Sequence, residues 1–189
     1  MDELYTFVYK GILTEESLDK AGRQKHEAYS IDEIAKLQRT LSYEMLDQEL
    51  LEQSKRMGLI YQAIYTIENM IRKLVTTSLT ETHGENWWDQ ISESIKKKVA
   101  ARQEEERKIK WHTSRGVSEI YYCDFGDLSA IICSNWDIFE YLLINQEWTK
   151  QLLSTLEKSR NVIMHGGILS LEDVERIGVN IRDWIRQTG

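Results

Sequence analysis

The sequence predicts an all-α protein, a bundle of about five or six helices. Apolar residues recur at intervals of three and four positions through most of the chain, the spacing that places them on one face of a helix. The chain contains no proline, so long helices are permitted. No alternation of strand and helix patterns indicates a parallel sheet. The N-terminal "LYTFVY" fits a short strand or a helical turn, so an irregular or strand-like segment is expected there.

The first clear helical pattern begins at Ser30. This serine is a good N-cap, and Glu33 three residues later completes a capping-box pattern. Apolar residues then follow at helical spacing as far as Leu50, and a second stripe begins at Met57. Gly58 is predicted to kink or divide these two helices, because glycine weakens a helix interior.

Further helices separated by turns are predicted in the second half of the chain. "THGENWWDQ" is expected to be a turn, followed by a helix from about Trp88 that ends in the charged run 96–110. "VSEIYYCDFG" has a strand-like composition but is short, so an extended loop is expected. Asp127 is a candidate cap for the helix "LSAIIC", and "NWDIFEYLLIN" is predicted to form another helix.

Two helices complete the chain. "EWTKQLLSTLEKSRNVIMH" is predicted to end at Gly166-Gly167, because glycine commonly follows a helix C-terminus. Ser170 and Asp173 then resemble a capping box for "LEDVERIGVNIRDWIRQ". We expect residues 41–189 to form one helical domain and residues 1–40 to form an N-terminal arm or extension, whose role the sequence does not indicate.

Composition limits the classes of function. The formal net charge is −7, so total charge does not steer the chain to nucleic acid, and an RNA site has to be a local basic patch. No apolar run reaches the roughly 18 residues of a membrane span, and the N-terminus lacks a signal-peptide pattern. Two cysteines, Cys123 and Cys133, fit a reducing compartment. We expect a cytoplasmic protein without membrane contact.

No metal and no cofactor are predicted. The four histidines are far apart in the sequence, and none lies in an HExxH or CxxC frame. The sequence also lacks a P-loop, a GxGxxG motif and a GxSxG motif.

The run 96–110 is a candidate RNA-binding surface. It contains seven basic and three acidic residues, and a local excess of positive charge attracts phosphate. Its candidate RNA-binding residues are Lys96, Lys97, Lys98 and Arg102. The interleaved glutamates leave a second interpretation open, an ordinary solvated helix face. The six tryptophans likewise have two interpretations, base stacking or the more common role of filling a core.

Glu68 and Arg72 are candidate supporting residues. Glu68 lies at the edge of the apolar stripe of its predicted helix, and Arg72 is one helical turn further on, where the two side chains can pair. One interpretation is an ordinary intrahelical ion pair. The other is an acidic group directed at a site between helices.

"SRNVIMHGG", residues 159–167, contains the candidate catalytic residues. Asn161 and His165 are four residues apart and share a helix face, so Asn161 can orient His165. Arg160 lies about 140° from His165 on an ideal helix. Arginine can neutralise a pentacoordinate phosphate, and histidine can transfer the proton. The alternative is a capped helix end with a conventional polar rim.

Cleavage of RNA by its own 2′-hydroxyl needs both an acid and a base. One histidine can serve as either, but the reaction needs the two together. Two copies of the chain meeting across a twofold axis would supply two histidines and two arginines. We therefore predict a homodimer with its active site at the seam.

Several segments resemble one branch of the HEPN superfamily (higher eukaryotes and prokaryotes nucleotide-binding). The superfamily signature is an arginine, a polar residue and a histidine at the spacing of Arg160, Asn161 and His165. The branch occurs at the C-terminus of a yeast transcript-surveillance endonuclease and in many bacterial proteins. The resembling segments are "MGLIYQAIYTIENMIRKLV", "GENWWDQ", "YYCDFGDLSAIICSNWDIFE" and "LEKSRNVIMHGGILSLEDVERI", which run through residues 56–177.

The resemblance implies a compact helical bundle that commonly dimerises. Active members are metal-independent RNases, often in toxin–antitoxin, abortive-infection and phage-defence systems, and leave a 2′,3′-cyclic phosphate and a 5′-hydroxyl. By this resemblance Arg160 and His165 are the catalytic pair, Asn161 is the polar residue beside the arginine, and Glu68 is the acidic residue on an early helix. The implied partners are RNA, a second copy, and an antitoxin or other protein. The alternative is a catalytically inactive HEPN module that binds RNA, a nucleotide or a partner protein.

Overall fold

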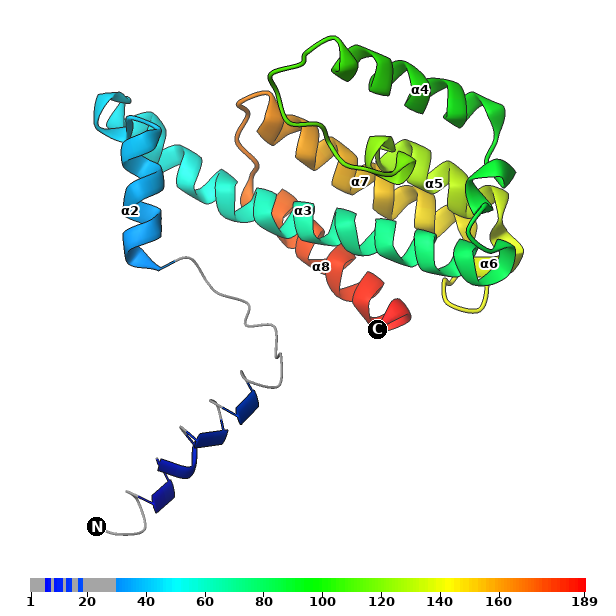
Figure 1. Cartoon of the computed structure of the whole chain (residues 1–189), viewed down its shortest axis with the longest axis horizontal. Coiled ribbons are helices and arrows are strands. Elements are labelled where there is room, and N and C mark those ends of the chain that lie inside the picture. The colour runs from blue at the N-terminus through cyan, green and yellow to red at the C-terminus, as the bar shows by residue number, and fades with distance from the viewer. Residues whose placement is uncertain (1–5, 8, 12, 15–16, 19–29) are drawn as a thin grey trace. The chain divides into compact units, whose positions relative to one another are not determined.

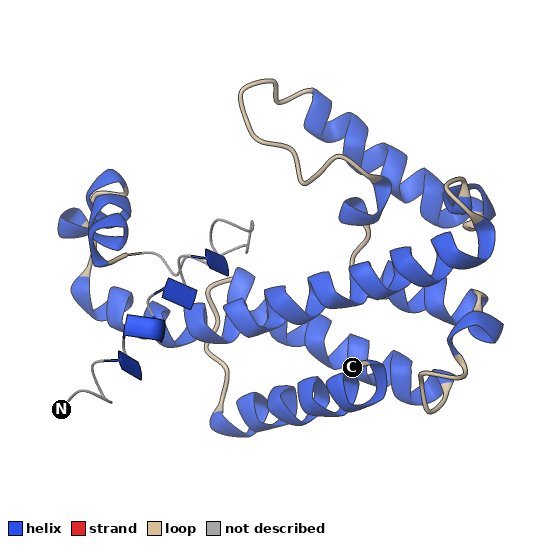
Figure 2. Cartoon of the chain, turned by 60° about the horizontal axis from the view of Figure 1, so that its bottom comes forward, coloured by secondary structure: helices blue, strands red, loops and turns tan. Residues whose placement is uncertain are grey.

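The computed structural model describes residues 6–7, 9–11, 13–14, 17–18 and 30–189. Within these residues all regular structure is helical and no strand occurs (Figure 2). The prediction of an all-α protein is therefore confirmed. "LYTFVY" lies partly outside the described residues, and those of its residues that are described, Thr6, Phe7 and Tyr9, are helical.

The chain divides into two compact units, Met1–Leu50 and Leu51–Gly189. Between Ile31 and Thr188 the chain forms seven α-helices and three short 3₁₀ helices, named η1 to η3 (Figure 1). Their bounds are α2 Ile31–Thr40, η1 Tyr43–Met45, α3 Gln48–His83, η2 Trp87–Gln90, α4 Glu93–Arg107, η3 Glu119–Tyr122, α5 Phe125–Ser134, α6 Trp136–Phe139, α7 Gln146–Met164 and α8 Leu171–Thr188. Across the described part of the chain, no helix combines the length and apolar character that crossing a bilayer requires.

Helix α2 begins with the predicted capping box. Glu33 N donates to Ser30 Oγ at 3.2 Å, and Ser30 N donates back to Glu33 Oε2 at 2.8 Å. The single helix predicted as far as Leu50 is wrong, because α2 ends at Thr40 and Ser42 takes a left-handed conformation with φ 54°. None of the ten residues of α2 is buried. Among the described residues, no core packs against the apolar stripe of α2, so only its own hydrogen bonds hold the helix together. Packing supplies most of the stability of a helix in a protein.

Helix α3 is continuous through Gly58, so the predicted division at this glycine is also wrong. A glycine costs a helix interior only about 1 kcal/mol relative to alanine. The buried neighbours Met57, Ile60 and Ile64 hold this part of α3 against the core. Burial of those side chains outweighs the local cost.

In the second unit α3 is the longest helix, and α5 lies alongside α7 in both ribbon views (Figures 1 and 2). The core of this unit is built mainly from the inward faces of four helices, with Phe139 of α6 and Ile95 and Val99 of α4 added. Its most deeply buried side chains include Ile64, Ile71, Val75 and Leu79 of α3, Phe125, Leu128 and Ile132 of α5, Leu153 and Leu156 of α7, and Trp184 of α8. Trp184 stacks on Trp148, with ring centroids 6.4 Å apart, so these tryptophans belong to the core. Trp111, by contrast, is 86% exposed.

Several predicted boundaries differ from the structure. The helix expected from about Trp88 begins at Glu93, because residues 87–90 form η2 and Ile91 is extended and buried. The expected extended loop "VSEIYYCDFG" contains η3 instead. The helix predicted over "NWDIFEYLLIN" is only α6, after which Leu143 turns back into the core.

Asp124, not Asp127, is the N-cap of α5. Its Oδ1 accepts from Asp127 N at 2.9 Å, and Asp127 Oδ2 accepts from Asp124 N at 3.3 Å. The two aspartates therefore form a capping box in which Asp127 is the third helical residue. This cap fixes where α5 begins, three residues after the end of η3.

The end of α7 is set by Gly166, as predicted. Gly166 has φ 76°, a region that glycine enters without strain. Gly166 N donates to Ile163 O at 3.0 Å and Gly167 N donates to Val162 O at 2.8 Å, which is the Schellman pattern. The last helical residue is Met164, and His165 is the C-cap. The capping box of α8, between Ser170 and Asp173, is present as predicted.

Candidate functional site

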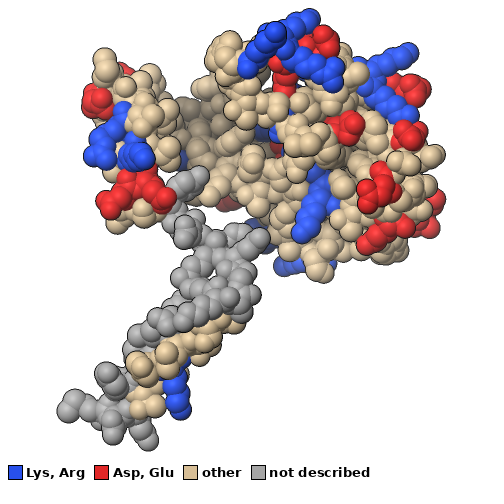
Figure 3. Space-filling view, viewed as in Figure 1, with Lys and Arg blue, Asp and Glu red and all other residues tan. Residues whose placement is uncertain are grey.

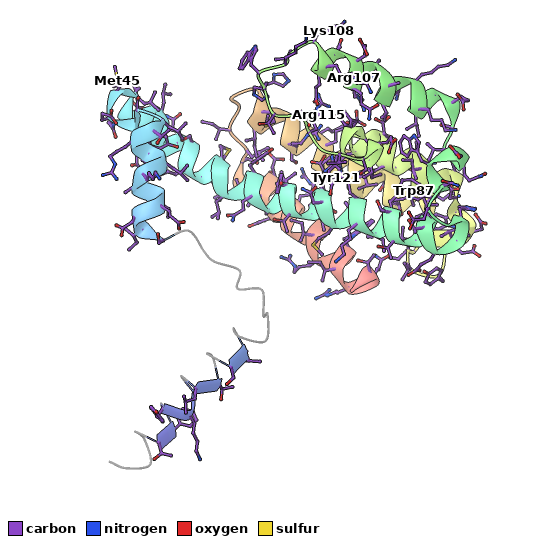
Figure 4. The ribbon with its side chains drawn as sticks, viewed as in Figure 1. Met45, Trp87, Arg107, Lys108, Arg115 and Tyr121 are labelled. Carbon is purple, nitrogen blue, oxygen red and sulfur yellow. The ribbon has the colours of Figure 1, made fainter. Side chains whose placement is uncertain are left out.

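A cavity of about 470 Å³ lies between α3, the segment that connects α4 to α5, and the C-terminal half of α7. Figure 4 shows Arg115 and Tyr121 together on that connecting segment, at the edge of α3. The lining residues are Tyr61, Tyr65, Glu68, Arg72, Arg102, Arg115, Tyr121, Cys123, Asp124, Arg160, Asn161 and Met164. The cavity thus contains five of the candidate site residues, namely Arg160, Asn161, Glu68, Arg72 and Arg102.

Glu68 joins two arginines at the floor of this cavity. Its Oε1 accepts from Arg160 Nη1 at 3.1 Å and also from Arg72 Nη2. The side chains of Glu68, Arg72 and Arg160 are 8%, 13% and 23% exposed. The pair expected one turn apart on α3 is therefore present, and it is more than an intrahelical pair, because Arg160 reaches it from α7.

Arg72 is held by backbone as well as by Glu68. Its Nη2 donates to Cys123 O at 2.9 Å and its Nε to Ile120 O at 3.3 Å. Its Nη1 donates to Asn69 Oδ1 at 3.3 Å. Nε and Nη2 bind α3 to the segment around η3, and Nη1 is held within α3 by Asn69, so all three nitrogens are used and Arg72 has a structural role.

Arg160 keeps hydrogen-bonding capacity. Its guanidinium carbon lies 5.5 Å from the centroid of the Phe125 ring, over the ring face. Its Nη2 approaches Asn161 Oδ1 at 3.5 Å, a long contact. Its Nε has no partner among the described residues. Glu68 and Phe125 therefore fix the plane of the guanidinium while part of its donor edge is left for an anion.

His165 lies apart from this arrangement within one chain. Its side chain is exposed at the end of α7, does not line the cavity, and makes no side-chain hydrogen bond to the described residues. The expected orientation of His165 by Asn161 is not seen. The side-chain oxygen of Asn161 faces Arg160, and only its backbone oxygen meets His165, accepting from the amide N at 3.1 Å. One chain thus places the arginine in the cavity and the histidine outside it.

A comparison with protein families identifies the second unit. The model of the Swt1-like HEPN family matches residues 62–189. The chain belongs to this family. The match includes every residue that lines the cavity except Tyr61. Membership places the chain among domains with an RNase-type or RNA-binding function. A search of curated proteins and a search of solved structures found no match.

In the basic run 96–110 of the HEPN domain, some cationic side chains bind carboxylates and others do not. Lys98 Nζ and Arg102 Nη1 bind Asp127 at 3.1 and 2.5 Å, and Arg102 Nη2 binds Asp124 at 2.7 Å. Lys96 binds Glu93, and Lys97 is exposed. Figure 3 shows positive and negative side chains intermixed over α4. Arg102 lines the cavity, but its charge is compensated there by two aspartates.

Seven of the twelve residues that line the cavity were not candidates from the sequence, namely Tyr61, Tyr65, Arg115, Tyr121, Cys123, Asp124 and Met164. Asp124 and Asp127 have a recognisable signal, because "DFGD" is an acidic capping pattern three residues apart. Arg115 and Tyr121 lie in irregular or 3₁₀ backbone, where residue spacing does not indicate which way a side chain faces.

Two further side chains near the cavity have shifted acidities. Burial raises the pKa of Glu157, which precedes Arg160 by one turn of α7, and the charge of Asp124 raises it further. Burial also raises the pKa of the Cys123 thiol to about 12. That thiol therefore stays protonated at neutral pH and is a poor nucleophile.

Asp127 is expected to make stability depend on acid pH. Burial raises the pKa of this carboxyl, but hydrogen bonds from Arg102, Lys98 and the Asp124 amide outweigh burial, and its pKa lies below the ordinary value. A depressed folded-state pKa means that the carboxylate stabilises the fold above its unfolded-state pKa, near 4, and that this contribution is lost as the pH falls through the folded-state value.

Asp127→Asn should therefore lower the free energy of unfolding by about 2 kcal/mol at pH 7, because it replaces a buried carboxylate that binds two cations with a neutral amide. The difference from wild type should shrink below about pH 4. Urea unfolding across this pH range measures both. Asp183→Asn, at an aspartate of α8 whose side chain is 41% exposed, is the control and should change stability by less than about 0.5 kcal/mol. If Asp127→Asn lowers the free energy of unfolding by the same amount at every pH, this account is contradicted.

Proposed function

We propose that the protein is a metal-independent endoribonuclease that acts as a homodimer with a composite active site. The observation that carries the proposal is Arg160, whose guanidinium is fixed by Glu68 and Phe125 at the wall of an open cavity. A phosphate-neutralising group is thus held in place without using all of its donors. His165, the C-cap of the same helix, lies outside that cavity and is free to meet its copy in a second chain.

In the proposed reaction one His165 removes the proton from the ribose 2′-hydroxyl. The 2′-oxygen then attacks the adjacent phosphorus, and Arg160 stabilises the charge of the phosphorane. The second His165 protonates the departing 5′-oxygen. The products are a 2′,3′-cyclic phosphate and a 5′-hydroxyl. Asn161, through its contact with Arg160, orients the arginine relative to the histidine of the site.

Mixed dimers test the composite site. Wild-type and His165→Ala chains are combined in equal amounts, refolded together, and assayed on labelled RNA in EDTA. If each site needs both histidines, only dimers of two wild-type chains cut, and specific activity falls to about a quarter of the wild-type value. Independent sites would leave about half, and that result would overturn the proposal. His83→Ala, at an exposed histidine at the end of α3, replaces His165→Ala in the control mixture and should leave activity unchanged.

A second candidate is a catalytically inactive HEPN module that binds RNA, a nucleotide or a partner protein. The observation that favours it is the separation of His165 from the cavity within one chain. The two candidates differ on expression in cells. A toxin-type or defence RNase should arrest growth, and His165→Ala should relieve the arrest, whereas a binding module should do neither. In both candidates residues 1–40 are proposed as an arm, and an antitoxin or other protein is a proposed partner.

A further inference from the structure

We propose that the cavity beside Arg160 is a subsite for one unstacked nucleotide of single-stranded RNA. The base would lie against Tyr65 and Tyr121, and its phosphate would bind Arg115 and Arg160. This inference rests on the proposed function in taking RNA as the substrate. It adds the form of RNA that is recognised and the residues, outside the arginine–histidine motif, that recognise it.

The size of the cavity fits a nucleotide. Its volume of about 470 Å³ lies in the range of small-ligand pockets, roughly 300–1,000 Å³. A pocket of this size admits one base with its sugar and phosphate and excludes a duplex. Bases inside a duplex are already stacked and paired, so only an unpaired nucleotide can turn its base into the pocket.

Aromatic rings are available at the wall of the cavity. Tyr65 is 57% exposed and Tyr121 is 45% exposed, although both line the cavity. Tyr61 extends the aromatic surface, with its ring centroid 6.3 Å from that of Tyr65. The neighbouring Tyr122 is buried and donates its hydroxyl hydrogen to Glu106 at 2.9 Å, so it is the structural tyrosine of the pair. Exposed tyrosines that do not fill the core are suited to stack on bases of any sequence.

Tyr121 is also held in position. A Cβ atom at Gly116 would stand 2.6 Å from carbon atoms of the Tyr121 ring. Glycine at position 116 therefore allows the backbone to approach this ring more closely than any residue with a side chain would. The ring is supported on that side, which reduces the entropy that a bound base would otherwise cost.

The arginines of the cavity fall into two classes. Arg72 and Arg102 are used by carboxylates and backbone carbonyls, as described above. Arg115 uses its Nε to bind Glu106 at 2.8 Å, and its two terminal nitrogens have no partner in the described part of the chain. Arg160 keeps its Nε free. The Nε of Arg102 also has no partner among the described residues, but two aspartates compensate the charge of Arg102. Arg115 and Arg160 each bind only one carboxylate, so they are the cavity arginines best able to bind a phosphate, and a guanidinium matches phosphate oxygens well.

Binding to a cleavage-deficient His165→Ala chain tests the subsite. The probe is a fluorescein-labelled single-stranded RNA of about eight nucleotides, compared with the duplex of the same sequence. Tyr65→Ala with Tyr121→Ala should weaken single-strand binding by at least about 10-fold. The same positions changed to Phe should bind nearly as wild type, because the stacking surface is kept. Arg115→Gln should weaken binding and reduce the slope of log K against log salt by about 1.

The controls are Tyr141→Ala, at a tyrosine 71% exposed and outside the cavity, and Arg186→Gln on α8. Neither should change binding. Equal binding by the double alanine variant and Tyr141→Ala, equal affinity for the duplex, or tighter binding of an acidic peptide than of RNA would each overturn the inference. Wild-type cleavage with no effect of the tyrosines would leave the proposed function standing without this subsite. Tyrosine-dependent binding without any cleavage would establish the subsite and reject the nuclease.

Discussion

The Arg160→Ala variant is expected to cut RNA at least about 100-fold more slowly than wild type in buffer that contains EDTA. Arg160 is the only described cavity arginine placed within the arginine–histidine motif, and in the proposed reaction its removal takes away the charge that stabilises the phosphorane. Initial rates on labelled RNA measure the effect, and the cyclic-phosphate end group identifies the reaction.

His165→Ala should lose activity to a similar or greater degree, because proton transfer contributes roughly 100- to 10,000-fold. Its side chain is exposed and makes no hydrogen bond in the described structure, so its loss should not change the unfolding midpoint. A His165→Ala enzyme that still cuts at the wild-type rate would reject the proposed chemistry.

Matched controls separate these effects from general ones. Arg186→Ala removes an arginine whose side chain is 77% exposed on α8, and His83→Ala removes an exposed histidine of α3. Both should keep wild-type rates. Arg160→Ala should also leave the fold largely intact, because Glu68 retains Arg72 as its partner. Loss of cleavage in a control would show that the assay reports stability instead of chemistry.

The largest effect on stability is expected at Glu68. Glu68→Ala leaves the two arginines it binds, both mostly buried, without their shared carboxylate. Removing one partner of a buried ion pair costs about 3 kcal/mol or more. In a chain of this size that corresponds to a fall in the melting temperature of roughly 6 to 12 °C. Thermal and urea unfolding of the full chain measure the loss.

A second variant shows whether the loss of stability in Glu68→Ala comes from the unpaired charge or from lost packing. Arg72→Met combined with Glu68→Ala should be less destabilising than the sum of the two single changes, because the stranded cation is removed together with its partner. Glu52→Ala, on the same helix and paired with Lys55 with side chains 69% and 67% exposed, is the control. It should cost less than about 1 kcal/mol. If Glu52→Ala and Glu68→Ala lower the free energy of unfolding equally, burial of the Glu68 ion pair is not what makes it important for stability.

Local features of the fold were predictable. The capping boxes at Ser30 and Ser170 and the end of α7 at Gly166 involve residues three to five apart, so their geometry follows from the helix itself. The Glu68–Arg72 pair was predictable for the same reason. The breaks were not predictable. Ser42 interrupts a stripe that the pattern continues, where no residue of α2 is buried. Gly58 does not interrupt a helix, because its neighbours Met57, Ile60 and Ile64 are buried in the core.

By itself the sequence determined the all-α class, the likeness to HEPN domains that the family match confirms, and the placement of Asn161 and His165 four residues apart. Only the tertiary structure decided that Arg160 binds Glu68, 92 residues earlier in the chain. It also decided that Arg102 is compensated by aspartates and that Arg115 joins the cavity wall. The physical reason is that helical periodicity sets contacts within one helix, whereas contacts between helices depend on how their buried faces pack together.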